Sequence, residues 1–204
     1  MLASSTIIND IEKLRKSGCA SLAMYYYDFR EQQKKDLRGL LSSILFQLCD
    51  QSDSYYDIIS AFHSAPRNGT QTPSDDVLVQ CLKDVLDLPG PVPVYLIIDG
   101  LDEFPSDTSL SSSREELLSL LEDFVKAKFK NVRMCITSRP EDDIQTILEP
   151  LAFRSVSLHG QREQQEDIKK YIESFVRSNR NMMNWDQEYR EHVIDVLTDG
   201  ADGM

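Results

Sequence analysis

Two groups of polar residues in this chain are of the types that bind a metal ion and a polyphosphate. Asp99, Asp102 and Glu103 follow an apolar run in the segment VYLIIDGLDEFP, and Arg139 follows the apolar run VRMCIT. Carboxylate oxygens hold Mg²⁺, often through water, while the ion bridges phosphate oxygens. An arginine close by can sense or stabilise the charge of a terminal phosphate. The pattern predicts a magnesium and phosphate site.

Each group also has a purely structural interpretation. Asp-Gly is a strong turn signal, and Asp102 and Glu103 are suited to capping a loop. Arg139 is equally suited to an ion pair with Glu141 or Asp142. The residues after Asp99 do not alternate as the second strand of a hairpin would, which favours the binding interpretation. In that case Asp99 is the metal ligand, and Asp102 or Glu103 orients a water molecule for attack on the phosphate.

The elements that must position these residues alternate along the chain. Strands are predicted at 20–27, 94–99, 132–137 and 154–158, and helices at 7–14, 37–48, 55–62, 77–85, 117–124, 144–148, 168–176 and 189–197. Loops are predicted at 66–76 and 105–113, and either Ser112 with Glu115 or Ser113 with Glu116 forms a capping box. The pattern is typical of one α/β domain with a parallel sheet covered on both faces. Ligands of such sheets lie beyond the carboxyl ends of the strands.

The composition disfavours several classes of partner and location for this protein. The chain has 204 residues, of which 41% are hydrophobic and 27% charged, and its net charge is −12. That acidity disfavours nucleic acid and anionic membranes as partners. No apolar run approaches the roughly 20 residues that span a bilayer, and the start does not resemble a signal peptide. The four cysteines lie far apart and are expected to be reduced and buried, which indicates a cytoplasmic protein.

A phosphate-gripping loop of the form G-x-x-x-x-G-K-[ST] is missing from the sequence. Such a loop holds phosphates with backbone amides and a lysine, and it lies between a strand and the first helix. None of the eight glycines falls in such a motif, and no lysine or glycine precedes Ile7.

The combination of segments resembles a NACHT-type P-loop NTPase domain of the STAND signalling class, in the form found in nephrocystin-like N-terminal domains and fungal NLR-like proteins. The resemblance covers nearly the whole chain, 1–204. It is carried by the opening LASSTII, by YYYDFRE, by VYLIIDGLDEFP as Walker B and by MCITSRPE as the sensor-1 strand.

The resemblance implies a three-layer α/β fold of the P-loop NTPase type that lacks the first central strand and the P-loop. By it, Asp99 matches the magnesium-associated aspartate, Asp102 and Glu103 the acidic pair linked to water activation, and Arg139 the sensor arginine. Intact relatives bind ATP or GTP with Mg²⁺ and hydrolyse it slowly. Met1 falls just past the missing Walker A motif, so this fragment is expected to bind nucleotide poorly or not at all.

Three interpretations of function remain open. The chain is a fragment of a nucleotide-dependent signalling switch, impaired in nucleotide binding and of doubtful activity. Alternatively it is a non-enzymatic interaction or scaffold module, with protein partners or self-association through unpaired strand edges. A third possibility is a truncated gene model whose product starts upstream. The first interpretation predicts four parallel strands, with a vacancy beside the sensor-1 strand, and marginal stability.

Overall fold

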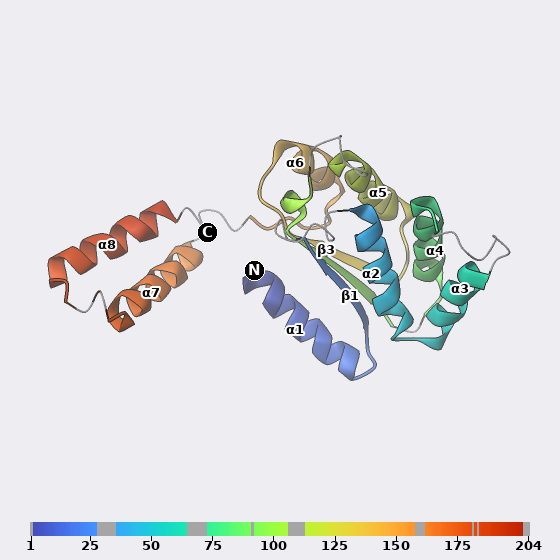
Figure 1. The fold of residues 1–204 in the computed structure, drawn as a ribbon, viewed down its shortest axis with the longest axis horizontal. Coiled ribbons are helices and arrows are strands. Elements are labelled where there is room, and N and C mark those ends of the chain that lie inside the picture. Colours follow the sequence, from blue (N-terminus) through green and yellow to red (C-terminus); the bar gives the residue numbers. More distant parts are fainter. Residues whose placement is uncertain are drawn as a thin grey trace. The chain divides into compact units, whose positions relative to one another are not determined.

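The structure, a computed structural model, describes residues 2–27, 36–64, 73–90, 92–105, 113–157, 162–180, 182 and 184–201. The chain divides into two compact units, residues 1–152 and residues 153–204. The first unit contains the sheet and the residues of the predicted site, and the second is a pair of helices (Figure 1).

The described strands and helices follow the alternation that the sequence predicts. The strands are β1 (Ser21–Tyr26), β2 (Val94–Asp99) and β3 (Val132–Ile136). The helices are α1 (Leu2–Lys16), α2 (Leu37–Cys49), α3 (Asp53–Ser64), α4 (Asp75–Asp87), α5 (Arg114–Ala127), α6 (Asp142–Leu148), α7 (Arg162–Ser178) and α8 (Gln187–Gly200). Two short 3-10 helices, η2 (Leu101–Glu103) and η3 (Glu149–Leu151), follow β2 and α6. Among these helices, none is long and apolar enough to span a membrane.

The three strands form a parallel sheet in the order β1-β2-β3. Val94 at the start of β2 is level with Ser21 of β1 and with Val132 of β3, so the strands end at the same edge. This register brings the segments that follow β2 and β3 together, and both segments contain predicted site residues.

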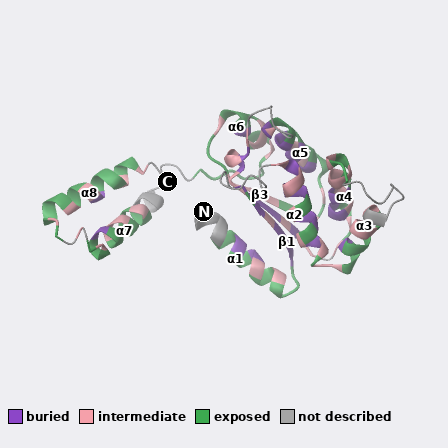
Figure 2. Ribbon diagram, in the orientation of Figure 1, coloured by how far each residue is buried: buried purple, intermediate pink, exposed green. Residues whose placement is uncertain are grey.

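Helices cover the two faces of the sheet unequally. Ile8 and Ile11 of α1 pack on one face, against Leu22 and Ile97. The opposite face joins the larger core, in which side chains of α2, α4 and α5 pack on alternate residues of the strands, such as Ala23 and Leu96. Successive residues of a strand point to opposite faces. Figure 2 shows buried residues on α1 as well as on α2, α4 and α5.

The prediction of a fourth strand at 154–158 is wrong for the part that the structure describes. Residues 154–157 form no strand and are exposed, and Leu158 lies outside the described residues. A strand needs a neighbour to satisfy its backbone groups, and no described strand pairs with this segment. Most of the predicted loops 66–76 and 105–113 also lie outside the described residues. Of the two candidate capping boxes, Ser113 with Glu116 is the one that forms.

The prediction of four buried cysteines is wrong for Cys19, which is exposed in the turn between α1 and β1. Gly18 adopts a positive φ of 71° in this turn and ends the helix, which directs the chain outward before β1 begins. All four thiols are free, but only Cys81 is fully buried, and Cys49 and Cys135 are half-buried.

Two glutamines, Gln47 of α2 and Gln51 in the turn that follows α2, close the outer edge of β1. Gln51 accepts a hydrogen bond from the Leu22 N–H at 2.9 Å and donates one to the Leu22 carbonyl at 2.7 Å. Gln47 does the same for Met24, at 3.0 Å and 2.7 Å. Residues two apart on a strand point the same way, so Leu22 and Met24 present their backbone groups to the same side. The two side-chain amides therefore take the place of a neighbouring strand.

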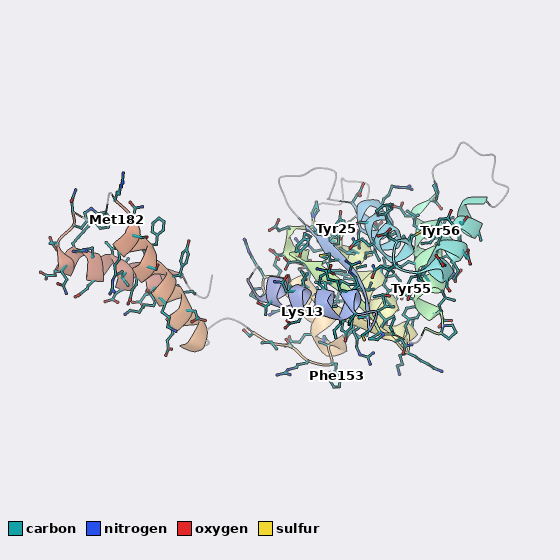
Figure 3. The ribbon with its side chains drawn as sticks, turned by 90° about the horizontal axis from the view of Figure 1, so that it is seen from below. Lys13, Tyr25, Tyr55, Tyr56, Phe153 and Met182 are labelled. Atoms are coloured by element: carbon teal, nitrogen blue, oxygen red, sulfur yellow. The ribbon has the colours of Figure 1, made fainter. Side chains whose placement is uncertain are left out.

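The second unit has a small apolar interior of its own. Only Val176 of α7 and Ile194 of α8 are buried within it among the described hydrophobic residues, while Tyr171 and Tyr189 are more than half exposed. Figure 3 shows the side chains of this unit around Met182.

Tyr55 and Tyr56 are adjacent residues of α3 in the first unit (Figure 3). Tyr55 packs into the core and Tyr56 is 57% exposed, as expected for neighbouring positions on an amphipathic helix.

Replacing Gln47 and Gln51 together by leucine should open the edge of β1. Four backbone groups would lose their partners, and each unsatisfied group costs about 1–3 kcal/mol when it is buried. We expect a fall of several kcal/mol in the free energy of unfolding, measured by urea titration with far-UV circular dichroism. We also expect light scattering that rises with protein concentration, because open strand edges associate.

The matched control is Gln80→Leu, since the amide of Gln80 bonds only to Asp84 on the surface of α4. The control should unfold within about 0.5 kcal/mol of the wild type. Equal stability of the double variant and the control would contradict the role given to Gln47 and Gln51.

Candidate functional site

Asp99 and Thr137 meet where β2 and β3 end. The hydroxyl of Thr137 donates a hydrogen bond to Oδ1 of Asp99, and it accepts one from the N–H of Gly100 at 3.2 Å. The backbone pairing continues past the strands, because the N–H of Leu101 donates to the carbonyl of Thr137 at 3.0 Å. Asp99 is therefore held at the carboxyl edge of the sheet by the strand next to it.

Gly100 turns the chain sharply after Asp99. Its φ of +75° lies in the left-handed region, which glycine adopts without strain. A Cβ at this position would stand 3.4 Å from the carbonyl oxygen of Tyr27 and 3.8 Å from the side chain of Glu103. The turn leads into η2, so that Asp102 and Glu103 lie at the same edge as Asp99.

Asp102 and Arg139 contact each other directly. Oδ1 of Asp102 accepts a hydrogen bond from the backbone N–H of Arg139 at 3.0 Å, and Oδ2 lies 3.4 Å from Nε of the same arginine. The Asp102 side chain is only 8% exposed, whereas that of Arg139 is 72% exposed. The carboxylate is thus buried beneath an arginine whose charged group reaches solvent.

Two neighbours of Asp99 have altered acidities. Tyr26 is level with Asp99 in the sheet, and its side chain is 41% exposed. Burial, and then the negative charge of Asp99, raise the pKa of the Tyr26 phenol and of the Cys135 thiol. Both groups are therefore neutral at physiological pH.

Arg114, which the sequence did not single out, connects the two loops of the site. It is the first residue of α5, placed there by the Ser113 capping box, and only 6% of it is exposed. Its guanidinium donates to the carbonyls of Asp102 and Phe104, and it forms ion pairs with Glu141 and Asp143.

The structure brings three of the four predicted side chains into two linked pairs, Asp99 with Thr137 and Asp102 with Arg139. Glu103 lies next to them, half-buried, and its side chain is near Gly100. The predicted alternative partners of Arg139 are not used: Glu141 pairs with Arg114, and no pair of Arg139 with Asp142 is seen in the described residues. Thr137 could have been predicted as a site residue, because it is a polar residue at the end of a strand.

The arrangement suits a cation that is held partly by these side chains and partly by a bound phosphate. Among the described residues, no group of three or more His, Cys, Asp or Glu side chains converges to form a complete metal site. Asp99 and Thr137 supply oxygen donors, which Mg²⁺ prefers, and a bound phosphate with water would have to supply the rest. An anion at this edge would also compete with Asp102 for Arg139.

Comparison with protein families gives a match to most of the first unit. The model of the family described as "Nephrocystin 3, N-terminal" matches residues 1–139, which include β1, β2, β3 and the residues from Asp99 to Arg139. No curated protein and no solved structure matches the chain significantly.

Replacing Asp102 by alanine should cost more stability than replacing Arg139 by alanine. Asp102→Ala leaves the Arg139 N–H without its acceptor and removes a largely buried carboxylate, at a cost of about 1–3 kcal/mol. Arg139→Ala keeps the backbone hydrogen bond and removes an ion pair whose arginine is 72% exposed, worth less than about 1 kcal/mol. Urea titration of both variants measures the difference. The reverse order would show that the ion pair, and not the buried hydrogen bond, holds the two loops.

Proposed function

Because the chain belongs to the nephrocystin 3 N-terminal family, we propose that it is part of a NACHT-type nucleotide-binding signalling switch of the STAND class. In this proposal the carboxyl edge of β2 and β3 is the side of the site that senses magnesium and the terminal phosphate. The nucleotide is ATP or GTP.

The observation that supports this most is the convergence of Asp99, Thr137, Asp102 and Arg139 at one edge of a parallel sheet. Asp99 and Thr137 would hold Mg²⁺ through water, and Arg139 would contact the terminal phosphate. Magnesium, when bound, neutralises charge on the phosphates. Glu103, and Asp102 once Arg139 has turned to the phosphate, would orient the attacking water.

In the absence of an anion, the Asp102 carboxylate and the Arg139 guanidinium pair with each other. Arg139 has 72% of its side chain exposed and is free to turn, whereas Asp102 is fixed beneath it. A terminal phosphate offers Arg139 a second negative partner of higher charge. The proposed switch therefore begins with the transfer of Arg139 from Asp102 to the phosphate.

The missing G-x-x-x-x-G-K-[ST] motif limits what this polypeptide does by itself. That loop supplies several charge-assisted hydrogen bonds, each worth about 1.5–3 kcal/mol. A loss of only about 3 kcal/mol moves a micromolar dissociation constant to above roughly 0.1 mM. We propose weak nucleotide binding and little or no hydrolysis by the 204 residues alone.

A second candidate function is a non-enzymatic interaction module. The observation that favours it is the difference between the two sheet edges: glutamines close the edge of β1, but no described strand pairs with the outer side of β3. Such an edge accepts a strand from another chain. A clean monomer in size-exclusion chromatography with light scattering, at concentrations up to about 0.1 mM, would count against this function.

Titration with Mg-ATP, followed by amide NMR spectra, tests the switch. We expect shifts of the amides of Asp99, Thr137 and Arg139, with a dissociation constant above about 0.1 mM. The shifts should weaken when Mg²⁺ is removed by chelation, and likewise in Asp99→Asn. The matched control is Asp123→Asn, an exposed aspartate of α5 beside Lys83.

Two results would contradict the proposal. The absence of any shift at this edge at about 10 mM Mg-ATP would exclude the nucleotide site. A micromolar dissociation constant, measured by isothermal titration calorimetry, would show that the phosphate grip is not needed.

A further inference from the structure

Arg114 is a buried cation to which the proposed function assigns no task. Only 8% of its side chain is exposed, and each of its three guanidinium nitrogens donates a hydrogen bond. Nε donates to the Phe104 carbonyl at 3.0 Å, and Nη2 donates to the carbonyls of Asp102 and Phe104 at 2.7 Å and 2.9 Å. A guanidinium is buried at a large cost in hydration unless all of its donors are used. All the donors of Arg114 are used only when the segment after β2 and the segment after β3 are both in place.

The partners of Arg114 lie on two separate segments. The carbonyls of Asp102 and Phe104 belong to η2 and the residue after it, which follow β2. The other partners, Glu141 and Asp143, flank the first turn of α6, which follows β3. These carboxylates are 41% and 46% exposed and would be well hydrated without the arginine. Arg114 therefore joins two loops that have no sequence proximity.

The same two loops are joined a second time by Asp102 and Arg139. Arg114 holds the main-chain carbonyl of Asp102, and Arg139 holds its carboxylate. The Arg139 carbonyl in turn accepts from the N–H of Glu141 at 2.9 Å, and Glu141 is a partner of Arg114. These contacts form a closed circuit through Asp102, Arg114, Glu141 and Arg139.

We propose that Arg114 is a positioning residue that makes the loop of Asp102 and the loop of Arg139 move as one body with the first turn of α6. A displacement of Arg139 by an anion is then transmitted to α6 through Glu141. The nature of that anion rests on the proposed function, but the coupling between the loops does not.

Amide hydrogen exchange, measured by NMR on the 204-residue chain without nucleotide, tests the coupling. The reporters are the N–H of Arg139, bonded to Asp102, and the N–H of Gln145, bonded to the carbonyl of Glu141 at 2.9 Å. In Arg114→Met both should exchange at least about ten times faster relative to Leu96 of β2, because loss of the anchor permits local opening. Arg114→Lys should recover at most part of the protection, since an ammonium cannot bind both carbonyls and both carboxylates.

A matched control separates this role from general stability. Arg133→Met removes an exposed arginine that donates a hydrogen bond to the adjacent carbonyl of Val132, and it should leave both ratios unchanged. A variant with Glu141→Gln and Asp143→Asn keeps Arg114 and loses only half-exposed charges, so it serves if Arg114→Met fails to fold. It should speed exchange at Gln145 and Arg139 and leave that of the Phe104 amide, bonded to the Leu101 carbonyl, unchanged.

Uniform acceleration of all amides in Arg114→Met would mean a role in global stability only and would overturn the proposal. So would wild-type exchange in the double carboxylate variant, or full recovery of protection by Arg114→Lys. Addition of Mg-ATP separates the two ideas. If the wild type does not respond to the nucleotide, the proposed function fails. The coupling stands in that case if the exchange ratios of the Arg114 and carboxylate variants, measured without nucleotide, change as expected.

Discussion

The parallel pairing of β2 with β3 is the constraint on which the candidate site depends. These strands lie side by side although more than thirty residues separate them, and their common register ends both at one edge. The hydroxyl of Thr137, just past β3, then reaches the carboxylate of Asp99 at the end of β2. Moving either strand by one residue would turn one of the two side chains to the opposite face. Side chains of β2 are buried on both faces of the sheet.

Burial of polar groups extends this constraint from the strands to the loops. Asp102 is buried with its carbonyl on Arg114 and its carboxylate on Arg139, so neither the acidic loop nor the arginine loop can move without exposing or orphaning a charge. A site built in this way has few accessible arrangements. That property suits a switch, because switches need a small number of discrete states.

Local patterns in the sequence were sufficient to predict most of the first unit. The unbroken apolar run before Asp99 predicted β2, and two candidate capping boxes, of which Ser113 with Glu116 forms, predicted the start of α5. The segment 154–158 failed because its alternating apolar residues satisfy the pattern of a strand, whereas a strand also needs a partner that local pattern cannot supply. Gln47, Gln51 and Arg114 were missed for a related reason. Each is an ordinary polar residue in a helix or just past the end of one, and its partners lie ten to about thirty residues away along the chain.

The two edges of the sheet determine where anything could be added to this site. The edge of β1 is closed by the amides of Gln47 and Gln51, which occupy the backbone groups of Leu22 and Met24. Just before and just after β3, the carbonyl of Asn131 and the N–H of Thr137 bond to β2. By the alternation of a strand, the backbone groups of Met134 and Ile136 face away from it.

On one face of β3, Val132, Met134 and Ile136 are half-buried and apolar, whereas the other face carries the half-buried Cys135 and the exposed Arg133. A strand added parallel to β3 would end beside Thr137 and Arg139, whichever chain supplied it. It would therefore bring its own following loop to the edge that holds Asp99. The interpretation as a nucleotide switch and the interpretation as an interaction module thus require the same physical event, the occupation of one strand position, and they differ only in what the arriving loop carries.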